Sequence, residues 1–582
     1  MKVPEFIENL LKQKGIDKLN PVQEMAIEAG LLNGENILIS SPTASGKTLI
    51  AEIAIINAIK NSKRAVYIAP MRALISEKFE EFKSDHPNIK VGLFMGEYDE
   101  YEYDLNRYDV IFASTEKFDS MLRNYNLSNS NIGCIVYDEI HMLGDRSRGS
   151  TLEFVITMNK LLFPKSQIIG LSATISNGEE ISAWLNSKFI YSDFRPVKLN
   201  KMIYLDGELI GEHTKKLKNI VNDPLINIVM NLIEEKKQAL IFNMNKKSTV
   251  STSKIIGDIL SNKLTENEKI QLNKISKEIL NVLDKPTEQC ENLAEVVKNG
   301  SAFHHAGLLN KQRKIIEDAF KSGYIKFICA TPTLALGVNL PANTVIISSI
   351  YRYDLKGMSL LPKMEVEQML GRAGRPKYDK EGNGIIIARN EREFDLINSK
   401  YINGDLERIT SSFVDYKTIE RYVLTLICTG TFKTKEDILN FLNYTFAAHL
   451  GADFDLYLDD ALDFLQSNKL ITDESPFEPT KLGKLINSLY LDPETGILFN
   501  SFLESKSSFS EFETLHIISM SGELDVIHMS QKEYEKYEEE SYQYNFGFEN
   551  IMDYERFVTS ITLAHILQDW INDKPSIQYF RP

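Results

Sequence analysis

Short apolar runs, each followed by a segment with helical spacing, recur along the first two thirds of the chain. Residues 37–39 predict a buried strand, and after a turn of small residues the run 47–54 has the apolar spacing of a helix. Further apolar runs predict strands at 134–137, 168–169 and 239–242. Strands that alternate with helices are typical of parallel α/β sheets. We therefore predict an α/β protein with two lobes of this kind, residues 1–200 and 201–400.

The pattern becomes mainly helical in the last third of the chain. Apolar positions with helical spacing occur at 419–427 and 462–471, and Pro, Thr and Gly then punctuate the chain up to Tyr490. This order predicts a winged-helix domain over 401–490, a module that either binds duplex DNA or packs against other domains. A further helical domain is expected over 491–582.

Two segments rich in charged residues also have helical spacing. Residues 261–300, rich in Lys, Asn and Glu, predict a helical insertion in the second lobe, and the acidic run 533–540 predicts a solvated helix face. The whole chain has a formal net charge of −15, which repels phosphate at long range. Binding of a nucleic acid therefore has to depend on the local arrangement of basic groups.

Length and composition indicate a globular protein of several domains. The 582 residues predict about three to five domains, and 43% hydrophobic with 25% charged residues is ordinary for a soluble protein. No apolar run approaches the roughly 20 residues that cross a bilayer, and the start of the chain lacks the apolar core of a signal peptide. We therefore expect a cytoplasmic protein with no membrane partner. The four cysteines lack Cys-x-x-Cys spacing, which predicts free thiols.

The segment 41–48, Ser-Pro-Thr-Ala-Ser-Gly-Lys-Thr, lies between the first predicted strand and helix. Strand, loop and helix in this order are the context of a phosphate-binding loop. Backbone N–H groups of the turn converge on the phosphates, Lys47 adds a positive charge, and Thr48 is a ligand for Mg²⁺. Ser41 stands where the general motif has its first glycine, but the turn stays compact. The other loop residues expected to bind ATP are Thr43, Ala44, Ser45 and Gly46.

Two carboxylates follow the predicted strand at 134–137. Asp138 and Glu139 stand at its end, where Asp138 can hold Mg²⁺ through water while Glu139 orients and deprotonates the attacking water. His141 can sense whether the two lobes have closed. This pattern predicts hydrolysis of the bound triphosphate.

Residues 368–376, Gln-Met-Leu-Gly-Arg-Ala-Gly-Arg-Pro, lie about 320 residues after the phosphate loop. Gln368, Arg372 and Arg375 have the spacing i, i+4 and i+7, which on a helix is one face. We therefore predict that a helix of the second lobe presents all three side chains to the γ-phosphate when the lobes close. A phosphate loop paired with distant arginines on a second lobe is typical of a nucleic-acid motor.

Residues 351–358 alternate aromatic and basic side chains before a glycine, which predicts a β-hairpin. Aromatic rings in such a hairpin can replace a lost base stack. The sequence alone is also that of an ordinary surface hairpin.

Residues 20–376 carry a series of short motifs in a fixed order. They are Asn20-Pro21-x-Gln23, the phosphate loop, Ala69–Leu74, Ser114–Lys117, Asp138–His141, Ser172–Thr174, Phe303–Leu308, Thr331–Pro341 and Gln368–Pro376. In this series the chain resembles superfamily-two helicases of the Ski-like branch. The phosphate loop, the run Arg148–Glu153 and the last motif look most like those of the archaeal Hjm DNA helicases, whose relatives include the helicase part of DNA polymerase theta.

The resemblance implies two RecA-like lobes, a winged-helix domain that braces them, and the beginning of a helical ratchet domain. It implies that Gln23 contacts adenine, that Gln368 helps to place the hydrolytic water, and that Arg372 and Arg375 are arginine fingers. Gly337 belongs to the motif that couples the ATP site to the nucleic acid. The residues implied to contact nucleic acid are Arg72, Thr115, His305 and Thr331, with Tyr351, Arg352 and Tyr353 in a wedge that parts the duplex.

The resemblance leads to three hypotheses about function. The first is an ATP-dependent DNA helicase that translocates 3′ to 5′ on single strands and unwinds forked or branched duplexes in replication-fork repair and recombination. The second is an RNA helicase of the Ski branch, against which the lack of a long arch-like insertion counts. The third is an ATP-gated clamp that remodels proteins on nucleic acid without unwinding.

The expected partners are single-stranded and forked DNA, with replication or recombination proteins as further candidates, and the expected state is a monomer. In the family, the ratchet domain continues with a helix that contacts the threaded strand. The sequence ends before that helix, so we expect either a shortened chain or a minimal homologue.

Overall fold

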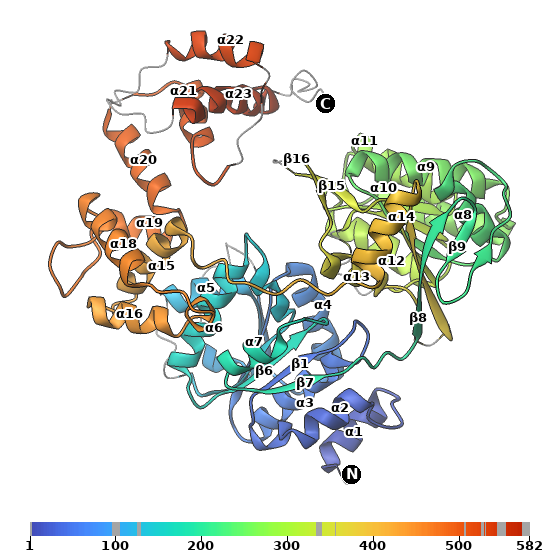
Figure 1. Ribbon diagram of the computed structural model, residues 1–582, viewed down its shortest axis with the longest axis horizontal. Helices are drawn as coiled ribbons and strands as arrows, with labels where there is room; N and C mark the ends of the chain where they lie inside the picture. The colour runs from blue at the N-terminus through green and yellow to red at the C-terminus, as the bar shows by residue number, and fades with distance from the viewer. Residues whose placement is uncertain are drawn as a thin grey trace. The chain divides into compact units, whose positions relative to one another are not determined.

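A computed structural model describes most of the chain. The described residues are 3–95, 105–124, 130–332, 334, 340–354, 357–376, 378–505, 508–524, 529, 531–543 and 554–572. They divide into two compact units, the first made of 1–119 and 127–410 and the second of 120–126 and 411–582. The first unit holds two lobes, each built on its own sheet (Figure 1).

The first lobe is a parallel sheet of seven strands in the order β3-β4-β2-β5-β6-β1-β7. The strands are β1 (Ile37–Ser40), β2 (Arg64–Ala69), β3 (Val91–Phe94), β4 (Val110–Ser114), β5 (Ile132–Tyr137), β6 (Gln167–Ser172) and β7 (Lys188–Tyr191). The helices are α1 (Glu5–Gln13), α2 (Pro21–Glu28), α3 (Lys47–Lys60), α4 (Arg72–Asp85), the first half of α5 (Thr115–Asn124), α6 (Gly149–Leu162) and α7 (Gly178–Trp184). Residues 120–124 of α5 belong to the second unit. β1, β5 and β6 are buried along their whole length. Parallel strands covered on both faces have unbroken apolar sequences, which explains the runs seen in the sequence.

The second lobe has a sheet of eight strands in the order β10-β9-β8-β17-β14-β11-β13-β12. The strands are β8 (Lys198–Leu205), β9 (Glu208–Ile210), β10 (Lys215–Lys216), β11 (Ala239–Phe242), β12 (Ser301–His304), β13 (Phe327–Ala330), β14 (Thr344–Ile347) and β17 (Glu381–Ile387). From β8 to β12 all neighbours are parallel, whereas β9 and β10 add antiparallel strands at one edge. Because β8 begins at Lys198, residues 198–200 belong to this sheet, and the linker between the lobes is 192–197.

The helices of the second lobe cover both faces of its sheet (Figure 1). They are α8 (Pro224–Glu234), α9 (Lys246–Ser261), α10 (Glu266–Leu280), α11 (Glu288–Lys298), α12 (Asn310–Lys321), α13 (Lys363–Leu370) and α14 (Glu391–Ile397). The predicted helical insertion is confirmed as α10 and α11. Its apolar side chains Leu272, Ile279, Leu293 and Val297 are fully buried in the core of the lobe, so the insertion is an integral part of this core. The predicted hairpin is confirmed as β15 (Tyr351–Asp354) and β16 (Gly357–Leu360).

The second unit is helical throughout its described part, apart from one antiparallel bridge between Ile471 and Pro479. Its helices are α15 (Tyr416–Cys428), α16 (Lys435–Asn443), α17 (Phe446–His449), α18 (Asp455–Ser467), α19 (Lys481–Ser488), α20 (Pro493–Ser505), α21 (Glu511–Ser519), α22 (Gln531–Ser541) and α23 (Tyr554–Ile571). A Cβ atom at Gly483 would lie 2.1 Å from the carbonyl oxygen of Leu470, so α19 can approach the bridge only with glycine there. The winged-helix assignment of 401–490 stays a prediction.

A separate apolar cluster holds the last helices of the second unit together. Phe502, Ile517, Phe557 and Ile561 are buried in it, together with Tyr537 of α22. Glu533, Glu535 and Glu539 on the same helix are exposed, as predicted for a solvated face. Glu538 and Glu540 of the same run are half-buried, and Glu540 pairs with His565 at 2.7 Å, so the prediction of a solvated face is confirmed only in part. None of the helices in the described ranges is long and apolar enough to span a membrane. All four cysteines are free, and Cys134, Cys290 and Cys329 are buried.

Glu420 on α15 provides a test of the packing within the second unit. Its partial burial, with repulsion from Glu494, Asp415 and Asp492, raises the pKa of the carboxyl to about 7. A carboxyl whose pKa is higher in the folded than in the unfolded protein stabilises the fold while it is protonated, and this contribution is lost as the pH rises through about 7. We therefore expect Glu420→Gln to raise the melting temperature by a few degrees at pH 8 and to change it little at pH 5.

Thermal unfolding at both pH values measures this effect. The matched control is Glu436→Gln on the exposed face of α16, which should leave the melting temperature unchanged at either pH. An equal effect of Glu420→Gln at pH 5 and pH 8 would contradict the prediction.

Candidate functional site

The predicted phosphate loop connects β1 to α3 and has a backbone that few residues can adopt. Gly46 at the N-cap of α3 has φ +85°, and Ala44 has φ +66°. No side chain caps α3 within the described structure, so its first N–H groups face the loop. The ammonium of Lys47 donates to the carbonyl oxygens of Ser41 and Pro42, at 2.6 and 2.9 Å. These are the features of a loop that binds phosphate through backbone N–H groups and one lysine.

Helix α2 packs directly against this loop. Asn20 and Gln23 form its capping box, and their amide groups donate to the carbonyl oxygens of Ser45 and Gly46, at 2.9 and 3.2 Å. A Cβ atom at Gly46 would lie 2.6 Å from Nε2 of Gln23. Glycine is therefore required there both by the backbone angle and by the close approach of Gln23.

The two predicted carboxylates lie at the end of β5, beside the loop. Asp138 is buried and accepts a hydrogen bond of 2.5 Å from the hydroxyl of Tyr67. Burial, together with the charge of Glu139, raises the pKa of Asp138 to about 6. Burial also raises the pKa of Glu139, against the opposing effects of Lys47 and Arg372. Glu139 has φ +54°, a strained angle for this residue that turns it out of the strand direction.

A chain of side chains connects Glu139 to the second lobe. Nδ1 of His141 lies 3.4 Å from Oε2 of Glu139, and Nε2 lies 2.6 Å from the amide nitrogen of Gln368. Burial lowers the pKa of His141 to about 4, so the ring is neutral at pH 7. Nδ1 also lies 3.4 Å from the backbone nitrogen of Ala173, which donates to it, and Nε2 faces the side-chain amide of Gln368. His141 thus joins the predicted base to a residue of the second lobe.

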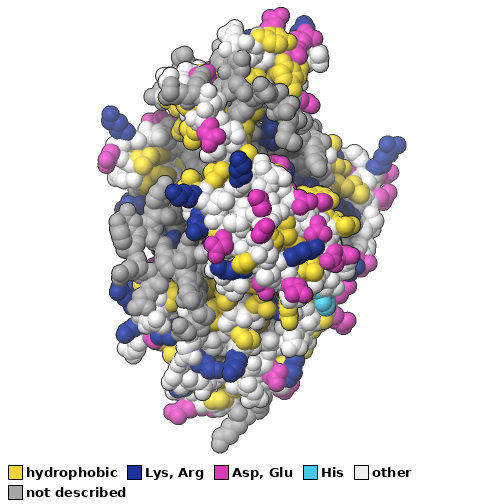
Figure 2. Space-filling model, turned by 90° about the vertical axis from the view of Figure 1, so that its left-hand side faces the viewer, with side chains coloured by type: hydrophobic (Ala, Val, Ile, Leu, Met, Phe, Trp, Pro, Cys, Tyr) yellow, Lys and Arg dark blue, Asp and Glu magenta, His cyan; other side chains and the backbone are white. Residues whose placement is uncertain are grey.

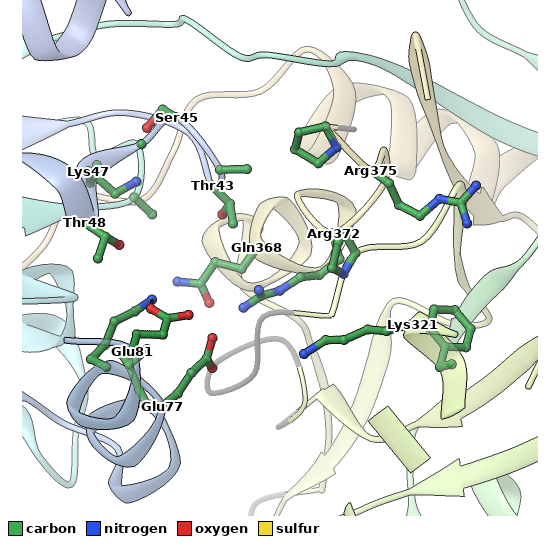
Figure 3. A pocket seen from close by; sticks show the side chains of 18 of the residues that line it. Thr43, Ser45, Lys47, Thr48, Glu77, Glu81, Lys321, Gln368, Arg372 and Arg375 are labelled. Atoms are coloured by element: carbon green, nitrogen blue, oxygen red, sulfur yellow. Dashed lines mark hydrogen bonds and ion pairs between the residues drawn. The ribbon is translucent and has the colours of Figure 1, made fainter. Parts of the chain in front are cut away.

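Residues of both lobes line one cavity of about 1080 Å³. The first lobe contributes the phosphate loop, the two carboxylates and Glu77, Lys78 and Glu81 of α4, and the second lobe contributes Gln238, Lys321, Gln368, Arg372, Arg375 and Tyr378. Figure 3 shows Lys47 and Thr48 on one side, and Gln368 and Arg372 reaching towards them from the other. The cavity therefore combines both halves of the predicted site.

The two arginines do not share one face of a helix, and that prediction was wrong. Helix α13 ends at Leu370, and the chain then forms a bridge between Ala373 and Ala342 and turns at Gly374, which has φ +91°. This contact, with a residue about 30 positions earlier in the chain, is not visible in the local spacing. Arg372 and Arg375 consequently point in different directions (Figure 3).

Arg372 and Arg375 also differ in their surroundings. Arg372 lies in the cavity, where burial lowers its pKa against the opposing charges of Glu139 and Glu77. The guanidinium of Arg375 is bound to Asp379 by contacts of 2.8 and 3.0 Å, and donates to Oε1 of Gln238 at 2.7 Å. Only Arg372 extends towards Gln368 in this structure (Figure 3).

The four candidate nucleic-acid residues outside the hairpin all follow the ends of parallel strands. Arg72 and Thr115 follow β2 and β4, and His305 and Thr331 follow β12 and β13. Arg72 is exposed, whereas the other three are buried. The hydroxyl of Thr115 has no hydrogen-bond partner among the described residues. In the first sheet, β2 and β4 lie on the far side of β5 from β1, so these residues are separated from the phosphate loop along the sheet edge.

The remaining candidates lie on the hairpin and in the segment 335–339. Tyr351 packs partly against the core of the second lobe, and Arg352 forms an ion pair of 3.0 Å with Glu365. Tyr353 pairs with Met358 in the ladder, and its side chain lies outside the described structure. Gly337 is also outside the described residues.

Several residues of the site have no signal in the short motifs. Tyr67, which binds Asp138, stands within an apolar strand, and Gln238 directly precedes β11. Asp379 has a local signal, because an acid four residues after an arginine is a common ion-pair spacing. Glu77 and Lys321 reach the cavity only through the packing of α4 and α12.

The fold and the site define a class of protein. Two α/β lobes that enclose a phosphate loop, a pair of carboxylates at a strand end and an arginine from the second lobe are typical of a two-lobed, nucleic-acid-dependent ATPase of helicase superfamily two. Two family models match the chain accordingly, the DEAD/DEAH box helicase over residues 20–181 and the helicase conserved C-terminal domain over 222–377.

Similar proteins identify the family within this class. The chain is 38% identical to an ATP-dependent DNA helicase Hel308 of Pyrococcus horikoshii, over 99% of the chain and 80% of that protein. The Hel308 of Pyrococcus abyssi is also 38% identical over the same shares, and that of Methanococcus vannielii is 36% identical over 97% of the chain and 83% of that protein. The chain therefore belongs to the Hel308 family, and the resemblance to Hjm-type helicases is confirmed.

Proposed function

We propose that this ATP-dependent DNA helicase translocates 3′ to 5′ along single-stranded DNA and unwinds forked or branched duplexes in replication-fork repair and recombination. The names of its relatives support the choice of DNA, and the family resemblance supports the direction and the substrate. The observation that carries strand separation is the two-stranded hairpin β15–β16, which stands apart from both large sheets and comes just before α13. A monomer is sufficient for this activity, since both lobes of the cavity come from one chain.

The cavity supports the following roles in hydrolysis. Lys47 and the backbone of residues 43–46, which line the cavity, bind the phosphates of ATP. Gln23 is buried against the loop and does not line the cavity, and the family resemblance alone supports its contact with the adenine. Glu139 takes the proton of the attacking water. Gln368 and His141 hold the side chains around this water in place. Arg372 stabilises the charge of the transferred phosphoryl group when the lobes close.

The oxygen donors of the site fit Mg²⁺. The hydroxyl of Thr48 and the carboxylate of Asp138 line the same cavity, and Mg²⁺ prefers hard oxygen ligands in sites that also retain water. When bound, Mg²⁺ neutralises charge on the β- and γ-phosphates. The hydrogen bond from the hydroxyl of Tyr67 orients the carboxylate of Asp138.

The proposed DNA path uses local groups rather than net charge. On the face shown in Figure 2, the acidic and basic side chains of the described residues are interspersed. Arg72, Thr115, His305 and Thr331 lie at strand ends in both lobes, where loops and helix N-termini meet phosphate. Contacts of this kind fix the strand without reading its sequence.

The hairpin separates unwinding from hydrolysis and so provides the test. Replacing residues 351–358 by a two-residue turn should abolish unwinding of forked DNA, because each stacking surface for a base contributes about 1 to 3 kcal/mol. The ATPase stimulated by single-stranded DNA should persist, since none of the hairpin residues that the structure describes lines the cavity. Strand displacement on forked DNA and ATPase with single-stranded DNA are measured on the same preparations.

Two controls make the result specific. Arg352→Ala removes one wedge side chain and its ion pair with Glu365 but keeps the hairpin, so it should reduce unwinding less than the deletion. Translocation along single-stranded DNA should continue in both variants. Equal unwinding by the shortened and the intact protein would exclude the wedge, and preference for 3′-tailed RNA duplexes would favour an RNA helicase.

A further inference from the structure

The linker between the lobes is attached to the first lobe beside the phosphate loop. The backbone N–H of Ser192 donates to the carbonyl oxygen of Ser40 at 3.1 Å, and Ser40 is the last residue of β1. Phe194 is partly buried and packs against the core of the first lobe. The first half of the linker therefore has a fixed position relative to the loop that starts at Ser41.

The second half of the same linker is attached to the segment that carries Arg372. Nη2 of Arg195 donates to the carbonyl oxygens of Gly371 and Ala373, at 2.8 and 2.5 Å. These two residues flank Arg372 in sequence, so one guanidinium nitrogen holds a carbonyl group of the residue before Arg372 and of the residue after it. Val197 is buried, and a Cβ atom at Gly374 would lie 2.6 Å from its Cγ1.

The Arg195 contacts are stronger and more specific than simple packing. Hydrogen bonds from a guanidinium to carbonyl oxygens are charge-assisted, and the carbonyl of Gly371 is at the C-cap of α13, where a positive charge is favourable. Helix α13 already has its own anchor to β8, the ion pair of 2.5 Å between Lys201 and Glu367. Arg195 therefore acts on the turn after the helix rather than on the helix as a whole.

We propose that Arg195 is a positioning residue for Arg372. Through Arg195, the linker holds the arginine finger at a defined position relative to the phosphate loop. Ser192 contacts the end of β1, and Arg195, close to it in the linker, contacts the segment 371–373 that carries the arginine finger. A change in the relative placement of the lobes consequently reaches the backbone of Arg372 directly. The proposal rests on the finger role of Arg372 in the proposed function.

The test compares Arg195→Met with Arg195→Lys in the DNA-stimulated ATPase. Loss of the two donated bonds should lower kcat by about 10- to 100-fold, the effect of a misplacement near 1 Å. KM for ATP should stay within about threefold, because Arg195 does not line the cavity. Lysine keeps a charged donor and should restore most of the rate. The matched control is Lys198→Met, which removes a nearby cation paired with exposed Glu212.

A double variant distinguishes positioning from a merely structural role. If Arg195 acts through Arg372, then Arg195→Met should cause no further loss of kcat in an Arg372→Ala background. Multiplied losses in the double variant, or a normal rate of Arg195→Met, overturn the proposal. If Arg195→Met does not fold, Arg195→Gln carries the same test, because the shorter neutral side chain cannot bridge both carbonyl groups.

The same variants show whether the positioning role of Arg195 fails alone or together with the finger role of Arg372. A normal stimulated rate in Arg372→Ala alone removes the finger assignment, and the positioning role with it. A large loss in Arg372→Ala together with a normal rate in Arg195→Met removes the positioning role only.

Discussion

Arg372→Ala is expected to lower the DNA-stimulated rate of ATP hydrolysis by about 10³- to 10⁵-fold, the usual contribution of an arginine finger. Both arginines line the cavity, but Arg372 faces Glu139 and Glu77, whereas the guanidinium of Arg375 is bound to Asp379 and Gln238. A guanidinium in that position stabilises charge that develops only in the transition state, so affinity for ATP should change by no more than about threefold. Steady-state ATPase and equilibrium binding of a fluorescent ATP analogue measure the two quantities.

Arg375→Ala is the informative comparison, because its surroundings predict a different outcome. Arg375 holds Asp379 and Gln238 and so connects the finger segment to the body of the second lobe. Its loss leaves a partly buried carboxylate without its cation, which should lower the melting temperature as well as kcat. Arg372→Ala should leave the melting temperature almost unchanged. If Arg375→Ala caused the larger catalytic loss at unchanged stability, the two arginines would have to exchange roles.

The elements that could be predicted from sequence are those whose signal is local. The phosphate loop, the acidic pair and the strands before them are contiguous in the chain, and their residue types determine both the backbone and the chemistry. The hairpin 351–358 and the helical insertion 261–300 have equally local patterns. The structure places all of these elements where the sequence predicted them.

The elements that could not be predicted depend on contacts between distant residues. Gln368, Arg372 and Arg375 have helical spacing, but the bridge from Ala373 to Ala342 ends the helix before either arginine. Burial of α10 and α11 in the core of the second lobe is likewise a property of the folded lobe, since their sequence is largely polar. The contact of Arg195 with the finger segment joins residues 176 and 178 positions apart. No pattern within either segment indicates the other.

Glu139→Gln is expected to block turnover while Mg·ATP still binds. The amide keeps the size of the carboxylate but cannot accept the proton of the attacking water, and loss of a general base costs about 10²- to 10⁴-fold in rate. Burial raises the pKa of Glu139, which makes its carboxylate a better base than an exposed one. Glutamine also preserves the hydrogen-bonding capacity towards His141, so the contact with Gln368 should remain.

Lys47→Ala gives the contrasting defect. Lys47 donates to the carbonyl oxygens of Ser41 and Pro42 within the phosphate loop and is proposed to bind the phosphates of ATP, so its loss should abolish hydrolysis by removing ATP binding. Binding of single-stranded DNA should stay within about threefold in both variants, because neither side chain is among the candidate DNA contacts. The two variants are therefore equally inactive but differ in affinity for the fluorescent ATP analogue. Steady-state hydrolysis near the normal rate in Glu139→Gln would exclude Glu139 as the base, and Asp138, also at the end of β5, would be the next candidate.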